Sequence, residues 1–259
     1  MVVITGAARG MGRAYADAFL ARGDRVVGLD RVWDAAPLEG ALMLRCDVTN
    51  PIDVTVARDR TLERFGTVDV LINNAAMRQR DLYPPHGAAA VLETRDEHWQ
   101  RMFDVNVLGV VRMIRAFVRP MLEQRRGSIV NIGSSGSVGV QVAEGVWAGG
   151  NPGFRNQPYA ASKAALTNLS FFLADELYPS NVAVNVVFPA GTRTTGSDEM
   201  VAGRAALGIR VARLLRPEHV VPLVLYLATQ DASGETGQAF DAVNWNQTHG
   251  HGGPEAWTA

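Results

Sequence analysis

The sequence contains a single cysteine, Cys46, so no disulfide can form within the chain and a reducing compartment is expected. Neither sign of charge dominates, because 25 lysines and arginines balance 26 aspartates and glutamates. That balance provides no field to attract nucleic acid or an anionic membrane. No apolar run approaches the roughly 20 residues of a membrane helix, and the first residues lack the pattern of a signal peptide. We expect a cytoplasmic protein that binds neither nucleic acid nor membrane.

What the sequence does contain is a regular alternation of short β-branched runs and longer amphipathic stretches. Strands are predicted at 1–5, 24–30, 41–48, 68–75, 128–133, 181–188 and 238–243, and helices at 10–23, 51–65, 97–124, 157–178 and 217–229. This alternation favours an α/β fold, a Rossmann-type doubly wound parallel sheet of about seven strands flanked by helices. We expect a single domain over residues 1–259, with insertions near 77–95 and 140–156 and a C-terminal tail near 244–259.

A glycine-rich stretch, TGAARGMG, stands where the first predicted strand meets the first helix. Gly6, Gly10 and Gly12 allow a tight turn and let the backbone approach a pyrophosphate, whose charge a helix N-terminus favours. Arg9 and Met11 complete this turn. By itself the motif is weak, because similar glycines also occur in turns that bind nothing. Together with an acid at the end of the second strand, it predicts a dinucleotide site.

Asp30 is that acid, and its carboxylate can accept hydrogen bonds from both ribose hydroxyls of an adenosine. Its charge would repel a 2′-phosphate, so Asp30 favours NAD over NADP, while Arg31 and Arg9 could soften this preference. Asp47 and Val48 end the third strand and could flank the adenine in the same way. The alternative for each of these residues is an ordinary position at the end of a strand.

Tyr159 and Lys163 stand four residues apart and share one face of a predicted helix. A tyrosine has a pKa near 10, too high for a base at neutral pH, and an adjacent ammonium lowers it. Such a tyrosine can take the proton of an alcohol as hydride leaves the carbon, or return it to a carbonyl. Ser134 or Ser135, at the end of a strand, could hold the substrate oxygen beside it. Asn106 is an amide in an otherwise apolar helix, a placement that a role in the site explains.

In this order, the motifs resemble those of the classical short-chain dehydrogenase/reductase (SDR) family over essentially the whole chain. The family's N-N-A-G motif is NNAA here, N-I-S-S is NIGS, and P-G-x-x-x-T is PAGTRT. The resemblance implies a catalytic tetrad of Asn106, Ser134, Tyr159 and Lys163. In it, Asn106 supports a water linked to Lys163, Lys163 lowers the pKa of Tyr159, and Ser134 polarises the substrate oxygen.

The same resemblance implies an NAD-dependent oxidoreductase that interconverts a secondary alcohol and a ketone by hydride transfer. It assigns further cofactor contacts to Asn74, Ala75, Pro189, Gly191, Thr192 and Thr194. It also implies a homotetramer or homodimer formed through the helices at 97–124 and 157–178. The tail departs from the family's usual short ending, and we expect its Trp245 and Trp257 to pack at a subunit interface. One alternative is an NADP-dependent 3-oxoacyl-type carbonyl reductase, which the negative charge of Asp30 opposes. Another is a catalytically silent dinucleotide-sensing regulator. Such a regulator would be expected to lack Tyr159 or Lys163, and this chain has both.

Two segments are longer than is usual in the family, one between Asn73 and Asn106 and the other between Ser134 and Tyr159. Both leave the carboxyl edge of the predicted sheet, so they should border the substrate pocket. Candidate substrate contacts are Ser135, Trp147, Phe154 and Arg155, with Tyr83, Arg78, Arg80 and His86 as further candidates. These side chains favour a small polar alcohol or ketone, such as a polyol, a sugar or a ring-bearing hydroxy acid. No metal site is expected.

Overall fold

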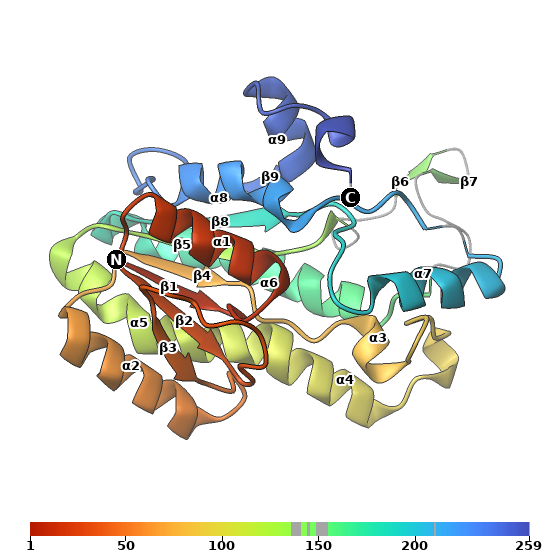
Figure 1. The fold of residues 1–259 in the computed structure, drawn as a ribbon, viewed down its shortest axis with the longest axis horizontal. Helices are drawn as coiled ribbons and strands as arrows, with labels where there is room; N and C mark the ends of the chain where they lie inside the picture. The colour runs from red at the N-terminus through yellow and green to blue at the C-terminus, as the bar shows by residue number, and fades with distance from the viewer. Residues whose placement is uncertain (136–140, 144–145, 149–154, 210, 259) are drawn as a thin grey trace.

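The protein is described by a computed structural model over residues 1–135, 141–143, 146–148, 155–209 and 211–258, with backbone alone at 141–143 and 146–148. Seven strands form one parallel sheet (Figure 1). Their spatial order is β3 (Leu42–Arg45), β2 (Val26–Asp30), β1 (Val2–Thr5), β4 (Val70–Asn73), β5 (Gly127–Ile132), β8 (Val182–Phe188) and β9 (Ala239–Asp241). The order reverses between β1 and β4, the switch point at which such sheets bind ligands. The predicted fold class is confirmed.

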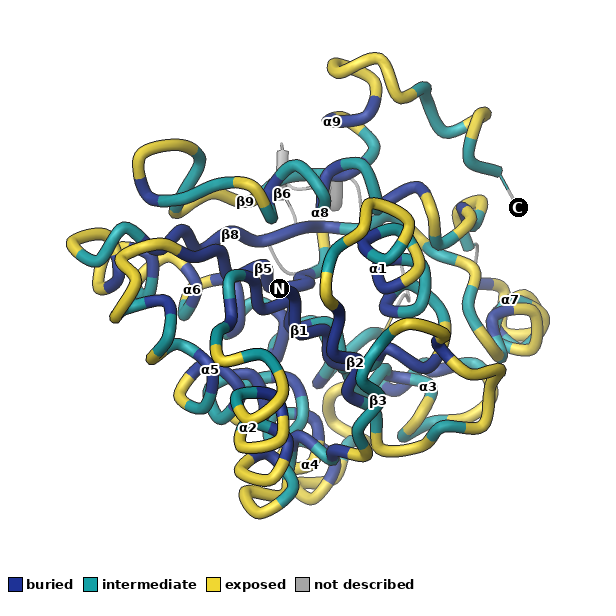
Figure 2. The backbone as a smooth tube through the Cα atoms, turned by 60° about the vertical axis from the view of Figure 1, so that its left-hand side comes forward, coloured by how far each residue is buried: buried dark blue, intermediate teal, exposed yellow. Residues whose placement is uncertain are grey.

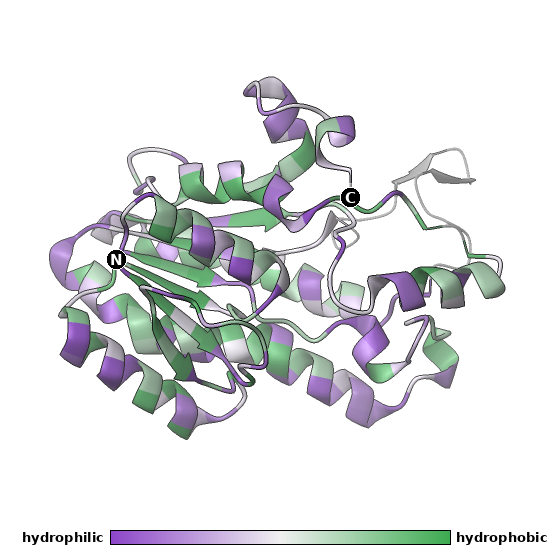
Figure 3. Cartoon of the chain, in the orientation of Figure 1, coloured by the Kyte–Doolittle hydropathy of each residue, from purple (hydrophilic) through white to green (hydrophobic). Residues whose placement is uncertain are grey.

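Helices cover both faces of this sheet (Figures 1 and 2). One face packs against α2 (Pro51–Phe65), α5 (Val110–Gln124) and α6 (Tyr159–Leu177), and the other against α1 (Gly10–Ala21), α8 (Val221–Leu227) and α9 (Ala242–Thr248). The strands are apolar almost throughout, as expected of a sheet that is covered on both sides (Figure 3). Within the described ranges, no helix is both long and apolar enough to cross a bilayer.

Helix α2 shows why local sequence predicts several helix ends well. Asn50 caps its first turn by accepting the N–H of Ile52 at 2.9 Å. Pro51 occupies the first helical position, where its missing N–H costs little. Gly66 ends the helix in the left-handed region, at φ 72°. These signals lie within the helix's own sequence, so the predicted range 51–65 agrees with the structure.

The helix predicted at 97–124 is instead three consecutive segments. These are α4 (Asp96–Phe103), a π-helical turn (Asp104–Gly109) and α5. The widened turn contains Asn106, whose side chain hydrogen-bonds the backbone of Met77 outside the helix. A π turn of this kind often marks a functional site.

Several further elements lie in stretches without a predicted structure. They are α3 (Gln79–Leu82), α7 (Ser197–Ala206), an antiparallel hairpin of β6 (Gln141–Ala143) and β7 (Val146–Ala148), and 3₁₀ turns at Val91–Glu93, Tyr178–Ser180 and Pro254–Trp257. The predicted helix at 217–229 is a 3₁₀ turn, Pro217–Val220, followed by α8. The predicted strand at 238–243 ends early, because Asp241 accepts the N–H of Asn244 and so starts α9.

Candidate active site

Tyr159 and Lys163 lie on the first two turns of α6, beside the carboxyl end of β5. Tyr159 is half-buried, whereas Lys163 is only 2% exposed. The Lys163 ammonium donates a hydrogen bond to the carbonyl oxygen of Ile132 at 2.6 Å. Burial lowers the pKa of Lys163 to about 8, since the charged form is poorly solvated there. A buried lysine with a lowered pKa therefore lies one helical turn from the tyrosine.

The Tyr159 hydroxyl hydrogen-bonds Ser134, which follows the end of β5. Burial raises the pKa of Tyr159 above its ordinary value, while the Ser134 hydrogen bond and the charge of Arg78 act in the opposite direction. The expected lowering by Lys163 is not what the geometry gives, because the Lys163 ammonium is directed to Ile132. Ser134, rather than Ser135, is the serine that contacts the tyrosine.

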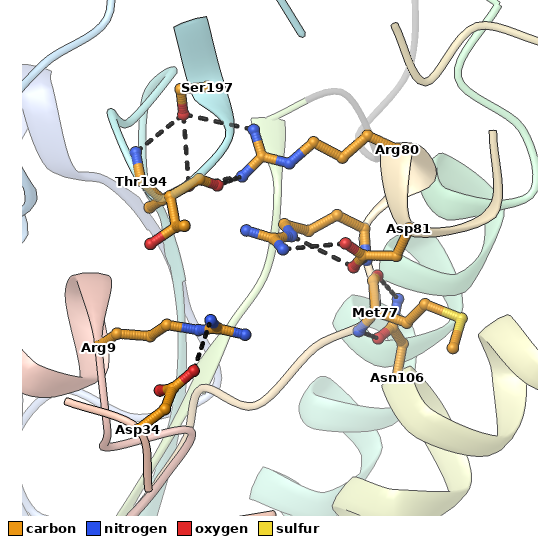
Figure 4. A network of polar contacts seen from close by, with 10 residues as sticks. Arg9, Asp34, Met77, Arg80, Asp81, Asn106, Thr194 and Ser197 are labelled. Atoms are coloured by element: carbon orange, nitrogen blue, oxygen red, sulfur yellow. Dashed lines mark hydrogen bonds and ion pairs between the residues drawn. The ribbon is translucent and has the colours of Figure 1, made fainter. Parts of the chain in front are cut away.

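Asn106 lies at the centre of the π turn and is fully buried. Its amide oxygen accepts the Met77 N–H at 2.8 Å, and its amide nitrogen donates to the Met77 carbonyl at 3.0 Å (Figure 4). The same nitrogen lies 2.9 Å from the Ser162 hydroxyl, next to Lys163 in sequence. Asn106 thus ties the chain after β4 to α6. Its expected support of a water at Lys163 stays a prediction.

The glycine turn between β1 and α1 is packed so tightly that side chains would not fit. Gly6 has φ +67°, and a Cβ at Gly12 would lie 2.1 Å from the Gly6 carbonyl oxygen. Asn74 braces the turn by donating to the carbonyl oxygens of Thr5 at 2.9 Å and Gly6 at 3.2 Å, and the Ala75 N–H bonds the Thr5 hydroxyl. A tight glycine turn at a helix N-terminus is the arrangement that binds the diphosphate of a dinucleotide in such folds.

The ends of β2 and β3 lie beside this turn. Asp30 accepts the N–H of Ala8 at 3.0 Å, which ties the end of β2 to the glycine turn. Asp47 accepts the N–H and the hydroxyl of Thr49, and although burial opposes them, these bonds hold the pKa of Asp47 below its usual value. Val48 is buried. Hydrogen bonds thus hold both carboxylates at this edge of the sheet.

Two basic residues predicted near the cofactor are found at the protein surface. Arg9 reaches Asp34 at 3.7 Å, and both side chains are about half exposed (Figure 4). Arg31 is exposed. Neither residue has the buried, fixed geometry of a dedicated phosphate clamp.

The PAGTRT stretch after β8 runs back toward the glycine turn. The methyl group of Thr194 would be 3.3 Å from a Cβ at Gly10. Gly191 and Arg193 exchange backbone hydrogen bonds with Leu215 at 2.8 Å, which fixes the path of Thr192 between them. This close approach brings the predicted residues Thr192 and Thr194 to the same edge as the turn. Pro189 and Met11 lie on the same two stretches and are half-buried.

An unpredicted set of contacts joins the 77–95 segment to α7. Arg80 donates to the Thr194 hydroxyl at 2.8 Å, the Thr195 carbonyl at 2.6 Å and the Ser197 hydroxyl at 3.3 Å (Figure 4). Arg204, only 3% exposed, donates to the carbonyl oxygens of His86 and Gly87. No local motif marks these arginines, because their partners lie more than a hundred residues away along the chain.

With this geometry in place, the chain can be compared with known proteins. The sequence profile described as short chain dehydrogenase matches residues 1–205. The chain belongs to the short-chain dehydrogenase family. As a short-chain dehydrogenase it is an oxidoreductase, and the family uses a nicotinamide dinucleotide.

Three similar proteins illustrate the range of this short-chain dehydrogenase family. A fluoren-9-ol dehydrogenase of Terrabacter sp. (strain DBF63) is 41% identical, over 99% of this chain and 74% of its own. A 3-alpha-(or 20-beta)-hydroxysteroid dehydrogenase of Mycobacterium bovis is 34% identical, over 93% of this chain and 86% of its own. An actinorhodin polyketide ketoreductase solved with NADPH has a TM-score of 0.78 at 26% identity, covering 93% of this chain and 94% of its own.

The predicted substrate contacts of this short-chain dehydrogenase differ in their exposure and in whether the structure describes them. Ser135 and Arg155 are exposed. Phe154 and the side chain of Trp147 lie outside the described residues. The Tyr83 hydroxyl lies 2.6 Å from His98 Nδ1, and its ring packs edge-on against that histidine, so its stacking on a substrate stays a prediction.

The arginines predicted to pair with an acidic substrate already have partners in the protein. Arg78 forms an ion pair with Asp81 at 2.9 Å, and Arg80 is bound to the α7 region as described. The ring of His86 accepts the N–H of Ala88. Each of these three side chains therefore has a partner within the protein, and their pairing with an acidic substrate stays a prediction.

The two tryptophans of the tail make contacts within their own chain, and their place at a subunit interface stays a prediction. Trp245 is 9% exposed and packs within its own chain, between Tyr226 and the stacked rings of His249 and His251. Trp257 donates to the His251 carbonyl at 3.1 Å. Aromatic stacking therefore folds the tail onto α8 and α9.

Proposed function

We propose that this short-chain dehydrogenase is an NAD-dependent enzyme that interconverts a secondary alcohol and a ketone. The observation that carries the proposal is the hydrogen bond between Tyr159 and Ser134 beside the buried Lys163, at the sheet edge that the glycine turn also reaches. A general acid–base and a hydroxyl that can orient the substrate oxygen are what carbonyl reduction and alcohol oxidation require.

In this proposal, the bound nicotinamide supplies or accepts the hydride. Ser134 holds the substrate oxygen by a hydrogen bond, and Tyr159 removes the hydroxyl proton during oxidation or donates it during reduction. Lys163, with its pKa near 8, exchanges that proton onward. Asn106 fixes the backbone that carries the segment beside Tyr159. The same four side chains serve both directions of reaction.

Asp30 supports NAD as the cofactor. Its carboxylate ends β2 beside the glycine turn, where a ribose with two free hydroxyls would be bound and a 2′-phosphate would be repelled. Arg9 and Arg31 are too exposed to outweigh that charge strongly. The NADPH in the similar polyketide ketoreductase makes NADP the specific alternative for the assay to exclude.

For the substrate, we favour an alcohol whose hydroxyl is carried on a ring system. Two of the similar proteins are named for fluoren-9-ol and for hydroxysteroids, which are both ring alcohols. The arginines that would recognise an acid are held by Asp81 and Thr194. This proposal keeps the ring-bearing alternative of the sequence prediction and moves away from sugars, polyols and hydroxy acids.

The decisive test is a turnover assay that follows the absorbance of reduced nicotinamide. The purified protein is given NAD or NADP with matched panels of fused-ring secondary alcohols, polyols, sugars and hydroxy acids, and the corresponding ketones with the reduced cofactors. We expect turnover with NAD and ring alcohols. Binding of NAD without turnover of any compound would instead support a nucleotide-sensing regulator, and a preference for 3-oxoacyl thioesters with NADPH would support the reductase alternative.

A further inference from the structure

The N-terminus of α6 is capped by a side chain from a distant segment. Gln79, on α3, is only 4% exposed. Its amide oxygen accepts the backbone N–H of Tyr159 at 3.2 Å, and its amide nitrogen donates to the Gln157 carbonyl. The first N–H groups of a helix have no partner within the helix, so this buried amide supplies one. Pro158, the residue before the helix, offers no side-chain cap of its own.

The segment that carries Gln79 is fixed on both sides. Asn106 holds Met77 through two hydrogen bonds, two residues before Gln79. Farther on, the Ala89 N–H donates to the Arg155 carbonyl at 3.1 Å, and Ala89 forms a parallel bridge with Asn156. Residues 77–89 therefore pack against the residues that precede α6. The hydrogen bond from Gln79 fixes the position of the Tyr159 backbone.

The segment that contacts Tyr159 through Gln79 also carries a pair of opposite charges, Arg78 and Asp81, on either side of Gln79. The Asp81 carboxylate accepts the Arg78 N–H at 2.7 Å and two guanidinium nitrogens at 2.9 and 3.2 Å. The positive charge of Arg78 favours the phenolate of Tyr159, and the negative charge of Asp81 disfavours it. The two charges thus act on one hydroxyl with opposite sign.

We propose that Arg78, Gln79 and Asp81 belong to the catalytic apparatus, with Gln79 positioning Tyr159 and the Arg78–Asp81 pair contributing to the electrostatic environment of its hydroxyl. The proposal rests on the proposed function of Tyr159 as the proton-transfer residue. The other groups that face this hydroxyl are Ser134, from the end of β5, and Lys163, on the same helix but directed to Ile132. Gln79, Arg78 and Asp81 are positioning residues, because they act through Tyr159.

Two substitutions separate this electrostatic role from a purely structural one. Arg78→Gln and Asp81→Asn break the same ion pair, so a role limited to that pair predicts the same effect from both. Each variant retains the backbone N–H of residue 78 and a side-chain oxygen at residue 81, the two atoms of the helix cap. The electrostatic role predicts opposite effects: the pKa of Tyr159 rises in Arg78→Gln and falls in Asp81→Asn. The double variant should return toward the wild-type value.

The measurement is the tyrosinate absorbance of each variant as pH is raised, minus that of the same variant carrying Tyr159→Phe. Circular dichroism at each pH shows whether the protein is folded, and only the pH values at which it is folded are included in the titration curve. The matched control is Arg58→Gln and Asp59→Asn, which break an exposed ion pair on α2 and should leave the Tyr159 curve unmoved. Shifts of equal sign in the two site variants, or no shift in either, would overturn the proposal. The readout needs no substrate, so it stands apart from the turnover assay.

Gln79 is tested by Gln79→Met, which keeps its length and apolar stem but removes both hydrogen bonds. Because catalysis depends on the exact placement of reacting groups, we expect kcat to fall roughly tenfold to a hundredfold. The dissociation constant for NAD should change less than about twofold, since the glycine turn is untouched. Equal losses in kcat and in NAD binding, or an unchanged kcat, would show that Gln79 does not position the base.

Discussion

The ammonium of Lys163 is hydrogen-bonded to the carbonyl oxygen of Ile132 at 2.6 Å, and only 2% of the residue is exposed. A buried ammonium destabilises the folded state for as long as it stays protonated there. Burial lowers its pKa from the ordinary 10.5 to about 8. Between these two values the unfolded chain holds a proton that the folded chain has released, so stability rises with pH across that window.

Replacing Lys163 by Met should therefore stabilise the protein at neutral pH while abolishing efficient turnover. The pKa difference corresponds to about 3 kcal/mol in the free energy of unfolding, gained below pH 8 and lost progressively toward pH 10.5. Urea unfolding at pH 7 and pH 10 measures the difference between variant and wild type. A difference that is equal at both pH values would contradict burial of a charged lysine. Lys163→Arg, which cannot release its proton, is the control.

Tyr159→Phe removes the hydroxyl that we propose exchanges the substrate proton, and it should reduce kcat by about 10²-fold to 10⁴-fold. NAD affinity should be nearly unchanged, because the glycine turn and Asp30 are untouched. Stopped assays with a ring alcohol give kcat, and fluorescence titration gives the NAD dissociation constant. Tyr178→Phe, at an exposed tyrosine beyond the end of α6, is the matched control. Full activity of the Tyr159 variant would refute the proposed proton transfer.

Asp30→Asn tests the basis of cofactor choice. The substitution retains an oxygen that can accept the Ala8 N–H but removes the negative charge. We expect the ratio of kcat/KM for NADP over NAD to rise by about tenfold or more, since a repelled phosphate is then tolerated. Asp24→Asn, an acid paired with Arg22 before the start of β2, should leave the ratio unchanged. If the two variants behave alike, Asp30 does not select the cofactor.

Phe172 tests the predicted self-association. It is 71% exposed on α6, close to the 39% exposed Phe171, and Leu108 in the π turn is 50% exposed. Exposed apolar side chains on these helices favour an interface between copies of the chain. Phe172→Asp should lower the mass measured by analytical ultracentrifugation, whereas Ile52→Asp on α2 should not. Unchanged mass in the Phe172 variant would place the interface elsewhere.

Most of the sheet and the glycine turn could be predicted because their signals are local. The glycines at 6, 10 and 12 and the caps Asn50 and Gly66 each act within a few residues. The supporting contacts could not be predicted in this way. Gln79 meets Tyr159 across 80 positions, and Arg80 meets Thr194 across 114. Nothing in a short window of sequence encodes such a pairing, so the sequence does not identify Gln79 and predicts Arg80 as a substrate contact.

The raised pKa of Tyr159 also depends on contacts between parts of the chain that are distant in sequence. A Tyr and a Lys four residues apart predict an electrostatic partnership on a helix face. In the folded chain the depth of α6 against β5 turns Lys163 to a carbonyl and desolvates the phenol. The effect of burial on the Tyr159 pKa is larger than any effect of the nearby lysine, and the spacing of residues in the sequence does not predict burial.

The hydrogen bonds from Gln79 to Tyr159 and Gln157 also affect how this enzyme could be redesigned. The stretch from Met77 to Ala89 borders the region expected to choose the substrate, and it is also what holds the base in place. Replacing that stretch with the one from a relative, in order to change substrate selectivity, would therefore also change the catalytic rate and its pH dependence toward those of the relative. A transplant that retains Gln79 and the pair at 78 and 81 would leave the proton-transfer step in its native state.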